Sequence, residues 1–362
     1  MFDHKHYVPI LRWKRGEQKA LEFLDPLIKQ KMTPFIELPP IDWDYENDVP
    51  KYTIDQQLDG IGQIVKDSWA QDRPVFVDTN ILVREDGSSM ENGQHVVEYV
   101  VNDIEQNGTP VVPVTGYGRD EEFHQAIKNT ISNFGNGVCV RLEEDDFDDL
   151  TNRLEWILQY YDIQLNEIDL VVDFKYVRPE DEKKTLRYLI GALVSLPNIN
   201  EWRTLTITST SVPEDLRDIK TGTDGSINRV EWAIYQSILD QKLSRFPAFG
   251  DYVISNPTYL NLDPRVIQIA AGIRYTIEDK YLIFRGKSVR DKRYGGWKQT
   301  RELSQRILAS GYFKGQTYSY GDGYIYQCAN GGNTGNAETW RRVGTNHHLT
   351  LAITALSNLH GI

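Results

Sequence analysis

The sequence contains few cysteines and no long hydrophobic segment. Its 362 residues include two cysteines, Cys139 and Cys328, which excludes a framework of several disulfide bonds. A reducing cytosol is therefore the expected compartment. A membrane-spanning helix needs roughly 18 or more consecutive apolar residues, and no such stretch occurs. The N-terminal residues also lack an apolar stretch of signal-peptide length, so we expect a cytoplasmic protein without a membrane segment.

Positive charge is scarce over the chain as a whole. There are 40 lysines and arginines against 52 aspartates and glutamates, and the formal net charge is −12. This balance argues against a broad nucleic-acid surface, because nonspecific binding to the phosphate backbone requires a positive surface. The segment 285–298 is a local exception, with six basic residues and one acidic residue. It predicts either a site for a phosphorylated ligand or a nucleic-acid backbone, or a solvated loop.

Short apolar runs alternate with amphipathic stretches along most of the chain. Runs typical of β-strands lie at 7–14, 32–40, 74–82, 109–117, 137–145, 167–177, 201–211 and 251–257. Helical stretches separate them at 16–31, 53–69, 92–107, 120–134, 147–161, 180–195 and 228–241. An open doubly wound sheet is the alternative, but the first strand–helix turn lacks the glycine pattern of a dinucleotide site. The alternation therefore predicts an α/β protein with a (β/α)8 TIM-barrel-like domain over residues 1–262.

The last hundred or so residues depart from this alternation. Residues 272–288 are typical of a β-hairpin, and a helix is expected from about 297 to 311. The Gly-, Asn- and Tyr-rich stretch 315–339 predicts a long ordered loop. A last helix is expected from Thr345 or Asn346 to about Asn358. We therefore predict a second unit, residues 263–362, that packs on the barrel as a hairpin, loop and helix elaboration.

Polar side chains end most of the predicted strands. In a barrel of this kind, chemistry occurs at the carboxyl ends of the strands. Glu37 and Asp78 have apolar neighbours, so burial is expected and would require a partner such as Lys14 or Arg141. These side chains predict either a ligand or catalytic site, or a structural ion-pair network in the barrel mouth. The candidates are Lys14, Glu37, Asp78, Thr115, Arg141, Asp173, Lys175, Ser209 and Ser255.

The stretch WRRVGTNHHL, residues 340–349, holds two arginines and two adjacent histidines near a predicted helix start. Adjacent helical residues diverge by about 100°, so His347 and His348 do not favour a shared zinc ion. Free backbone N–H groups at a helix N-terminus, with Arg341 or Arg342 beside them, favour an anion. The alternative is that an arginine pairs with an acidic residue while a histidine packs against Trp340.

Two groups of motifs resemble the bacterial and bacteriophage family called Beta protein. They are YVPILRWKRGEQKAL with MTPFIEL near the start, and RG, GGW, SYGDGYI and WRRVGTNHHL near the end. The resemblance implies a phage–host or anti-phage context and no established reaction. The residues that carry it are Lys14, Gly16, Glu17, Glu37, Arg285, Gly286, Trp340, Arg341, Gly344, His347 and His348.

One functional hypothesis is an enzyme that hydrolyses a phosphodiester in a nucleotide or nucleic acid. Arg285, Arg341 and either His347 or His348 would hold the phosphoryl group. Glu37 and Asp78 would act as acid or base if burial raises their pKa. Mg²⁺ would bind at Glu37, Asp78 and Asp173 if a cation takes part.

The other hypothesis is a non-catalytic sensor or interaction protein of an anti-phage system. The same pocket would then bind a phage component or a signalling nucleotide, and a partner protein or an oligomer would carry the response. The chain contains no motif of a named hydrolase class, which favours this alternative. Mass spectrometry of a copurified ligand discriminates between them, since an intact nucleotide favours the sensor.

Under the enzymatic hypothesis, Glu37→Gln and His348→Ala are each expected to abolish phosphodiester hydrolysis. Each substitution removes a group that the reaction needs for proton transfer. Turnover assays of the two variants check this expectation, and full activity in both would contradict it.

Overall fold

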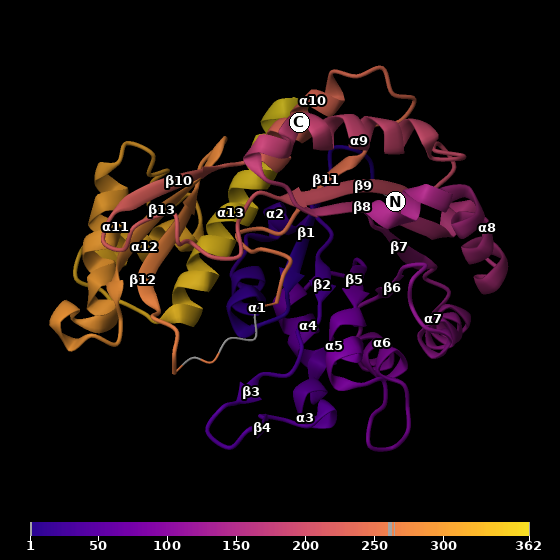
Figure 1. The fold of residues 1–362 in the computed structure, drawn as a ribbon, viewed down its shortest axis with the longest axis horizontal. Coiled ribbons are helices and arrows are strands. Elements are labelled where there is room, and N and C mark those ends of the chain that lie inside the picture. The colour runs from indigo at the N-terminus through magenta and orange to yellow at the C-terminus, as the bar shows by residue number, and fades with distance from the viewer. Residues whose placement is uncertain (1, 260–262, 264, 362) are drawn as a thin grey trace.

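The computed structural model describes residues 2–259, 263 and 265–361. Eight parallel strands close into a barrel in the order β1-β11-β9-β8-β7-β6-β5-β2 (Figure 1). Their bounds are β1 Tyr7–Arg12, β2 Phe35–Glu37, β5 Val75–Asp78, β6 Val111–Thr115, β7 Val138–Leu142, β8 Ile168–Tyr176, β9 Thr204–Thr210 and β11 Ala248–Asp251. The predicted (β/α)8 barrel is confirmed.

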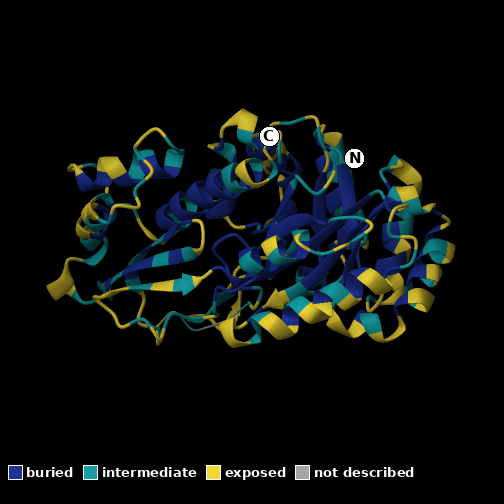
Figure 2. Cartoon of the chain, turned by 90° about the horizontal axis from the view of Figure 1, so that it is seen from above, coloured by how far each residue is buried: buried dark blue, intermediate teal, exposed yellow. Residues whose placement is uncertain are grey.

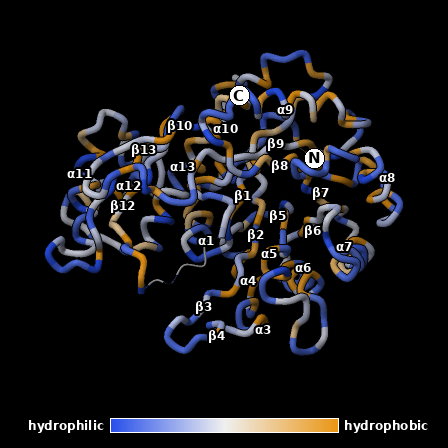
Figure 3. Tube along the Cα trace, in the orientation of Figure 1, coloured by the Kyte–Doolittle hydropathy of each residue, from blue (hydrophilic) through white to orange (hydrophobic). Residues whose placement is uncertain are grey.

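Helices surround the barrel, and the longer ones bury an apolar face against the strands or their neighbours. Figure 2 shows buried strands inside and helices with exposed outer faces. The helices are α1 Arg15–Glu22, α2 Pro26–Lys29, α3 Ile54–Leu58, α4 Ile61–Trp69, α5 Asn80–Asp86, α6 Val96–Gln106, α7 Glu121–Phe134, α8 Leu150–Tyr161, α9 Glu182–Ser195 and α10 Val230–Leu239. Hydrophilic residues dominate the outlying hairpin of β3 (Trp43–Asp44) and β4 (Val49–Pro50) (Figure 3). Within the described residues, no helix is both long and apolar enough to cross a membrane.

The eighth strand differs from its predicted position at 251–257. β11 ends at Asp251, and Val253 has a φ of 58°, which lies outside the β region. The backbone N–H of Val253 donates to the Asp251 carboxylate, which stabilises this turn. The apolar run therefore continues past the strand as a buried loop that returns over the barrel mouth.

A second sheet lies beside the barrel, in the order β10-β13-β12 (Figure 1). The predicted hairpin is confirmed as β12 (Ala270–Thr276) and β13 (Lys280–Ser288). β10 (Asp224–Asn228) precedes residue 262 but pairs with β13. The division of the chain at residue 262 thus stays a prediction, and one strand of the earlier part joins this sheet.

Three helices complete the C-terminal part: α11 (Thr300–Ala309), α12 (Tyr320–Ala329) and α13 (Ala337–His360). The predicted long loop 315–339 is wrong, because α12 occupies its middle and begins at a Ser319 cap. The predicted start of the last helix is also wrong, because α13 begins eight residues before Thr345, with Asn336 as its N-cap. α13 lies between the barrel and the second sheet, and contacts α1 and β12 (Figure 1).

Gly344 explains the wrong helix start. It lies inside α13, where a Cβ atom would come within 2.9 Å of Ile254 and 3.0 Å of the Arg274 carbonyl. Glycine is required there by close packing of the helix on the barrel loop and on β12, and does not mark a turn.

We expect Gly62→Ala to destabilise the protein by about 1–3 kcal/mol, although alanine is the better helix former. Its Cβ would lie 2.2 Å from the Asp103 carbonyl, where α4 packs on α6. Gly191→Ala is the matched control, because nothing lies within 4 Å of that Cβ in α9. Urea unfolding should show the control stabilised by about 0.5–1 kcal/mol; equal effects of the two substitutions would contradict the packing.

Candidate functional site

Arg141, near the end of β7, lies at the centre of a buried polar cluster in the barrel mouth. Its Nη1 donates to Glu37 Oε1 at 2.9 Å and to Asp78 Oδ2 at 2.8 Å. Its Nε and Nη2 donate to Asp173 Oδ2 at 2.9 and 2.7 Å. Nη2 also donates to the Tyr252 hydroxyl at 2.6 Å. One guanidinium therefore connects the ends of four strands and the loop after β11.

Strand geometry places these side chains together. Side chains alternate along a strand, so residues two apart lie on the same face. Phe35, Phe76, Cys139 and Val171 belong to the apolar cluster inside the barrel. Glu37, Asp78, Arg141 and Asp173 each follow one of them by two residues, and so form the next layer toward the mouth.

Glu37 bonds Arg141 through one oxygen only. The residue is 1% exposed, and its Oε2 takes no part in the bonds to Arg141. Burial raises the pKa of Glu37, the Arg141 charge opposes this, and the Asp78 charge raises it further. Tyr259 is a near neighbour: burial, the Glu37 charge and a side-chain hydrogen bond to Glu37 raise the pKa of its phenol. A buried carboxyl with a raised pKa keeps its proton to a higher pH than a free glutamate, which makes it a candidate acid–base group.

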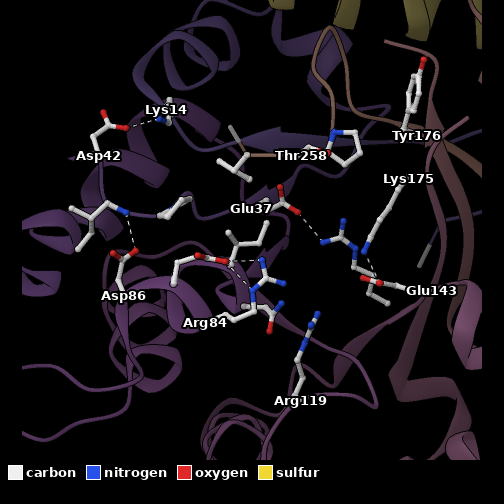
Figure 4. Close-up of a pocket in the computed structure, with 18 of the residues that line it drawn as sticks. Lys14, Glu37, Asp42, Arg84, Asp86, Arg119, Glu143, Lys175, Tyr176 and Thr258 are labelled. Atoms are coloured by element: carbon white, nitrogen blue, oxygen red, sulfur yellow. Dashed lines mark hydrogen bonds and ion pairs between the residues drawn. The ribbon is translucent and has the colours of Figure 1, made fainter. Parts of the chain in front are cut away.

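A cavity of about 740 Å³ opens above this cluster (Figure 4). Its basic lining residues are Lys14, Arg84, Arg119, Arg141 and Lys175. Its acidic lining residues are Glu37, Asp42, Glu85, Asp86 and Glu143. Three exposed or half-exposed pairs lie around it: Lys14–Asp42, Arg84–Glu85 and Lys175–Glu143.

Arg119 is a lining residue that the sequence analysis missed. It lies in the loop between β6 and α7, points toward the cavity (Figure 4), and is 13% exposed. Its Nη2 lies 3.7 Å from Asp78 Oδ2, and its Nε has no hydrogen-bond partner. The available signal was its position directly after a strand end, in the loops where barrel sites lie.

Four predicted site residues line the cavity, namely Lys14, Glu37, Arg141 and Lys175. Asp78 and Asp173 lie in the layer that bonds Arg141, and Ser209 is buried in β9 away from the cavity lining. Predicted ion pairing of Glu37 with Arg141 is confirmed.

The predicted C-terminal residues do not join this cavity. Arg285 donates to the carbonyls of Leu216 and Ile219, which anchors the segment before β10. Arg342 lies over the rings of Phe23 and Tyr320. Arg341 donates to Ser255 Oγ at 2.8 Å, on the loop after β11.

His347 and His348 are fully buried inside α13 rather than at its N-terminus, so free N–H groups of a helix start are not beside them. His348 bonds Asp251 Oδ2 at 2.9 Å and Thr276 Oγ1 at 3.0 Å, and burial lowers its pKa. His347 bonds Asp322 Oδ2 at 2.8 Å and the Thr276 carbonyl at 2.8 Å. The two rings thus connect α13 to the barrel, β12 and α12. Neither histidine lines the cavity, and their roles in catalysis and anion binding stay predictions.

The carboxylates suggested for Mg²⁺ converge on Arg141 instead of on a point open to a cation. Across the described part of the chain, no three acidic, histidine or cysteine side chains form a group that could hold a metal ion. The guanidinium supplies the positive charge that these acids require.

A family model described as Beta protein matches residues 7–354. A mutant tryptophan synthase α-subunit from Pyrococcus furiosus is 12% identical with a TM-score of 0.42, over 70% of this chain and 90% of that chain. Triosephosphate isomerase from Bartonella henselae is 9% identical with a TM-score of 0.34, over 68% of this chain and 92% of that chain. These likenesses concern the fold alone. No curated protein matches the chain.

We expect Arg141→Met to destabilise the protein by about 3–5 kcal/mol at pH 7, because it leaves buried carboxylates without a counter-charge. The pKa of Glu37 in the folded protein is raised above its ordinary 4.5, so the folded state binds this proton more tightly than the unfolded state. The resulting stabilisation is fully present below pH 4.5 and is lost as the pH rises through the folded-state pKa. The deficit of the variant should therefore shrink between about pH 7 and pH 5.

Urea unfolding at the two pH values measures this deficit. Arg84→Ala is the control, because that side chain is 67% exposed and its loss should change stability by less than about 0.5 kcal/mol. A pH-independent deficit in Arg141→Met would contradict the role assigned to the carboxylates.

Proposed function

We propose that this chain, which belongs to the Beta protein family, binds a small phosphorylated ligand in its barrel mouth and hydrolyses a phosphodiester bond there. The observation that carries the proposal is Glu37, a buried carboxyl with a raised pKa and one oxygen outside the bonds to Arg141, next to an open cavity. Perturbed carboxyls in clefts are typical of acid–base sites.

The cavity suits a ligand of nucleotide size. Its volume of about 740 Å³ lies within the usual range for small-molecule sites. Trp43, Tyr176 and Tyr259 line it and offer aromatic surface to a base. The positive charge that a phosphate group requires comes from Arg119, Lys14 and Lys175. On binding, Lys14 would release Asp42, and Lys175 would release Glu143, to pair with the ligand instead.

Glu37 is the proposed acid–base group. In its protonated form it would donate a proton to the leaving ester oxygen as water adds to phosphorus and the P–O ester bond breaks. The attacking water then returns a proton to Glu37, so the residue is unchanged after one turnover. Arg119 would bind the phosphate oxygens of the ligand, since its Nε has no other hydrogen-bond partner.

A non-catalytic sensor is the second candidate function. Among the described residues that line the cavity, none is a serine, cysteine or histidine, so the lining holds no Ser–His or Cys–His pair. The cavity would then hold a nucleotide or a phage component unchanged, and a partner protein or an oligomer would carry the signal. The phage–host context implied by the family resemblance is compatible with both candidates.

We expect Glu37→Gln to lower kcat for phosphodiester hydrolysis by about 10²-fold or more while ligand binding persists, because it removes the proton donor. Arg119→Ala should mainly raise KM or Kd, because it removes a positive charge from the cavity. Hydrolysis of bis(4-nitrophenyl) phosphate and of dinucleotides, with and without Mg²⁺, provides the measurement.

Glu22→Gln is the matched control, since Glu22 lies in α1 outside the cavity and pairs with Lys19. Full turnover by Glu37→Gln would contradict the acid–base role. Mass spectrometry of the ligand released from the purified wild-type protein tests the second candidate: an intact nucleotide without turnover would favour the sensor.

A further inference from the structure

Three arginines from distant parts of the chain converge on the loop after β11, residues 254–258. Arg12, at the end of β1, donates to the carbonyls of Asn256 and Thr258. Arg274, on β12, donates to the carbonyl of Ile254. Arg341, on α13, donates to Ser255 Oγ at 2.8 Å.

Close packing of α1 on α13 holds Arg341 in this cluster. A Cβ atom on Gly16 would lie 2.7 Å from Arg341 Cγ, so only glycine leaves room for the arginine. The same contact brings Arg341 Nε within 3.6 Å of Glu17 Oε1. Gly16, Glu17 and Arg341 belong to the motifs that carry the family resemblance, which gives these motifs a common location.

Among the described residues, acidic side chains balance only part of the positive charge of this cluster. Glu17 is the acidic side chain paired there, and it is 4% exposed. Glu37 also acts on Arg12, but one of its oxygens already bonds Arg141. Lys14 adds a further positive charge near Glu17. Three guanidiniums and one paired carboxylate leave an excess of two positive charges at a half-buried place.

The electrostatics of the individual groups agree with this imbalance. Burial, followed by the charge of Arg341, lowers the pKa of Arg274 to about 9. Burial also lowers the pKa of Arg12, and Arg341 adds to that effect. Buried like charges are costly unless a counter-ion is present, so the cluster favours binding of an anion.

We propose that Arg12, Arg274 and Arg341, with the Ser255 hydroxyl, form a site for a phosphate group, separate from the proposed catalysis at Glu37. A phosphate dianion matches the excess of two charges, and its oxygens match the forked donors of guanidinium groups. Arg12 Nε is a buried donor without a hydrogen-bond partner, which an anion oxygen would satisfy. The Arg341 side chain is 37% exposed and gives the anion a path from solvent.

The proposed anion site keeps Arg341 from the sequence-based prediction but has different residues beside it. The histidines and the helix start take no part, because His347 and His348 bond Asp322, Asp251 and Thr276. Arg12 and Arg274 replace them as the groups that face the anion beside Arg341.

Thermal unfolding of the full chain in sodium phosphate, compared with sodium chloride of equal ionic strength, tests this site. Wild-type protein should gain about 2–4 °C in Tm from phosphate in the millimolar range. Equilibrium dialysis with labelled inorganic phosphate should show binding that Arg341→Gln weakens at least about tenfold, since one charged fork is lost. Arg341→Lys keeps the charge and should retain part of the binding.

Arg217→Gln is the matched control, because Arg217 is an exposed arginine outside the cluster, paired with Asp215. Arg274→Met provides a second test inside the cluster, and its phosphate response should also disappear. A parallel titration with a nucleoside monophosphate shows which phosphate the site binds. A response to the nucleoside monophosphate alone indicates that the phosphate group belongs to a larger ligand. A response to inorganic phosphate indicates that the site binds the free ion. Equal stabilisation by phosphate and chloride, or an unchanged phosphate response in Arg341→Gln, would overturn the proposal.

Discussion

The buried guanidinium of Arg141 is the interaction on which the barrel mouth depends. Carboxylates at the ends of β2, β5 and β8 all bond it, and Tyr252 joins them from the loop after β11. Without this cation the three acids would be buried with no counter-charge from Arg141. The same arrangement leaves one oxygen of Glu37 outside the bonds to Arg141. The group proposed for acid–base chemistry is thus part of the network that stabilises the barrel mouth.

Much of the barrel could be predicted because its signals are local. Each apolar run reports a strand covered on both faces, and the residue that ends the run reports the layer at the mouth. Glu37, Asp78 and Asp173 were found in this way, as was Arg141 as a partner. Their convergence on a single guanidinium could not be predicted, because strand order and tilt decide which residues of the layer meet.

The errors lie where long-range packing overrides local signals. Gly344, Thr345 and Asn346 resemble a helix start, yet contacts with Ile254 and Arg274 keep this stretch inside α13. Because the helix start was predicted wrongly, the burial of His347 and His348 was not predicted either. Arg12 and Arg274 were missed for a related reason: one ends a strand of the barrel, the other lies in the second sheet, and only docking of the two sheets brings them together.

The position of β10 has a consequence for how the chain can be divided. The chain leaves the barrel after β9, adds β10 to the outer sheet beside β13, and returns to the barrel as α10. The outer sheet is therefore built from two separate stretches of the chain. A fragment that ends at residue 262 would keep β10 without β13, the strand with which it pairs.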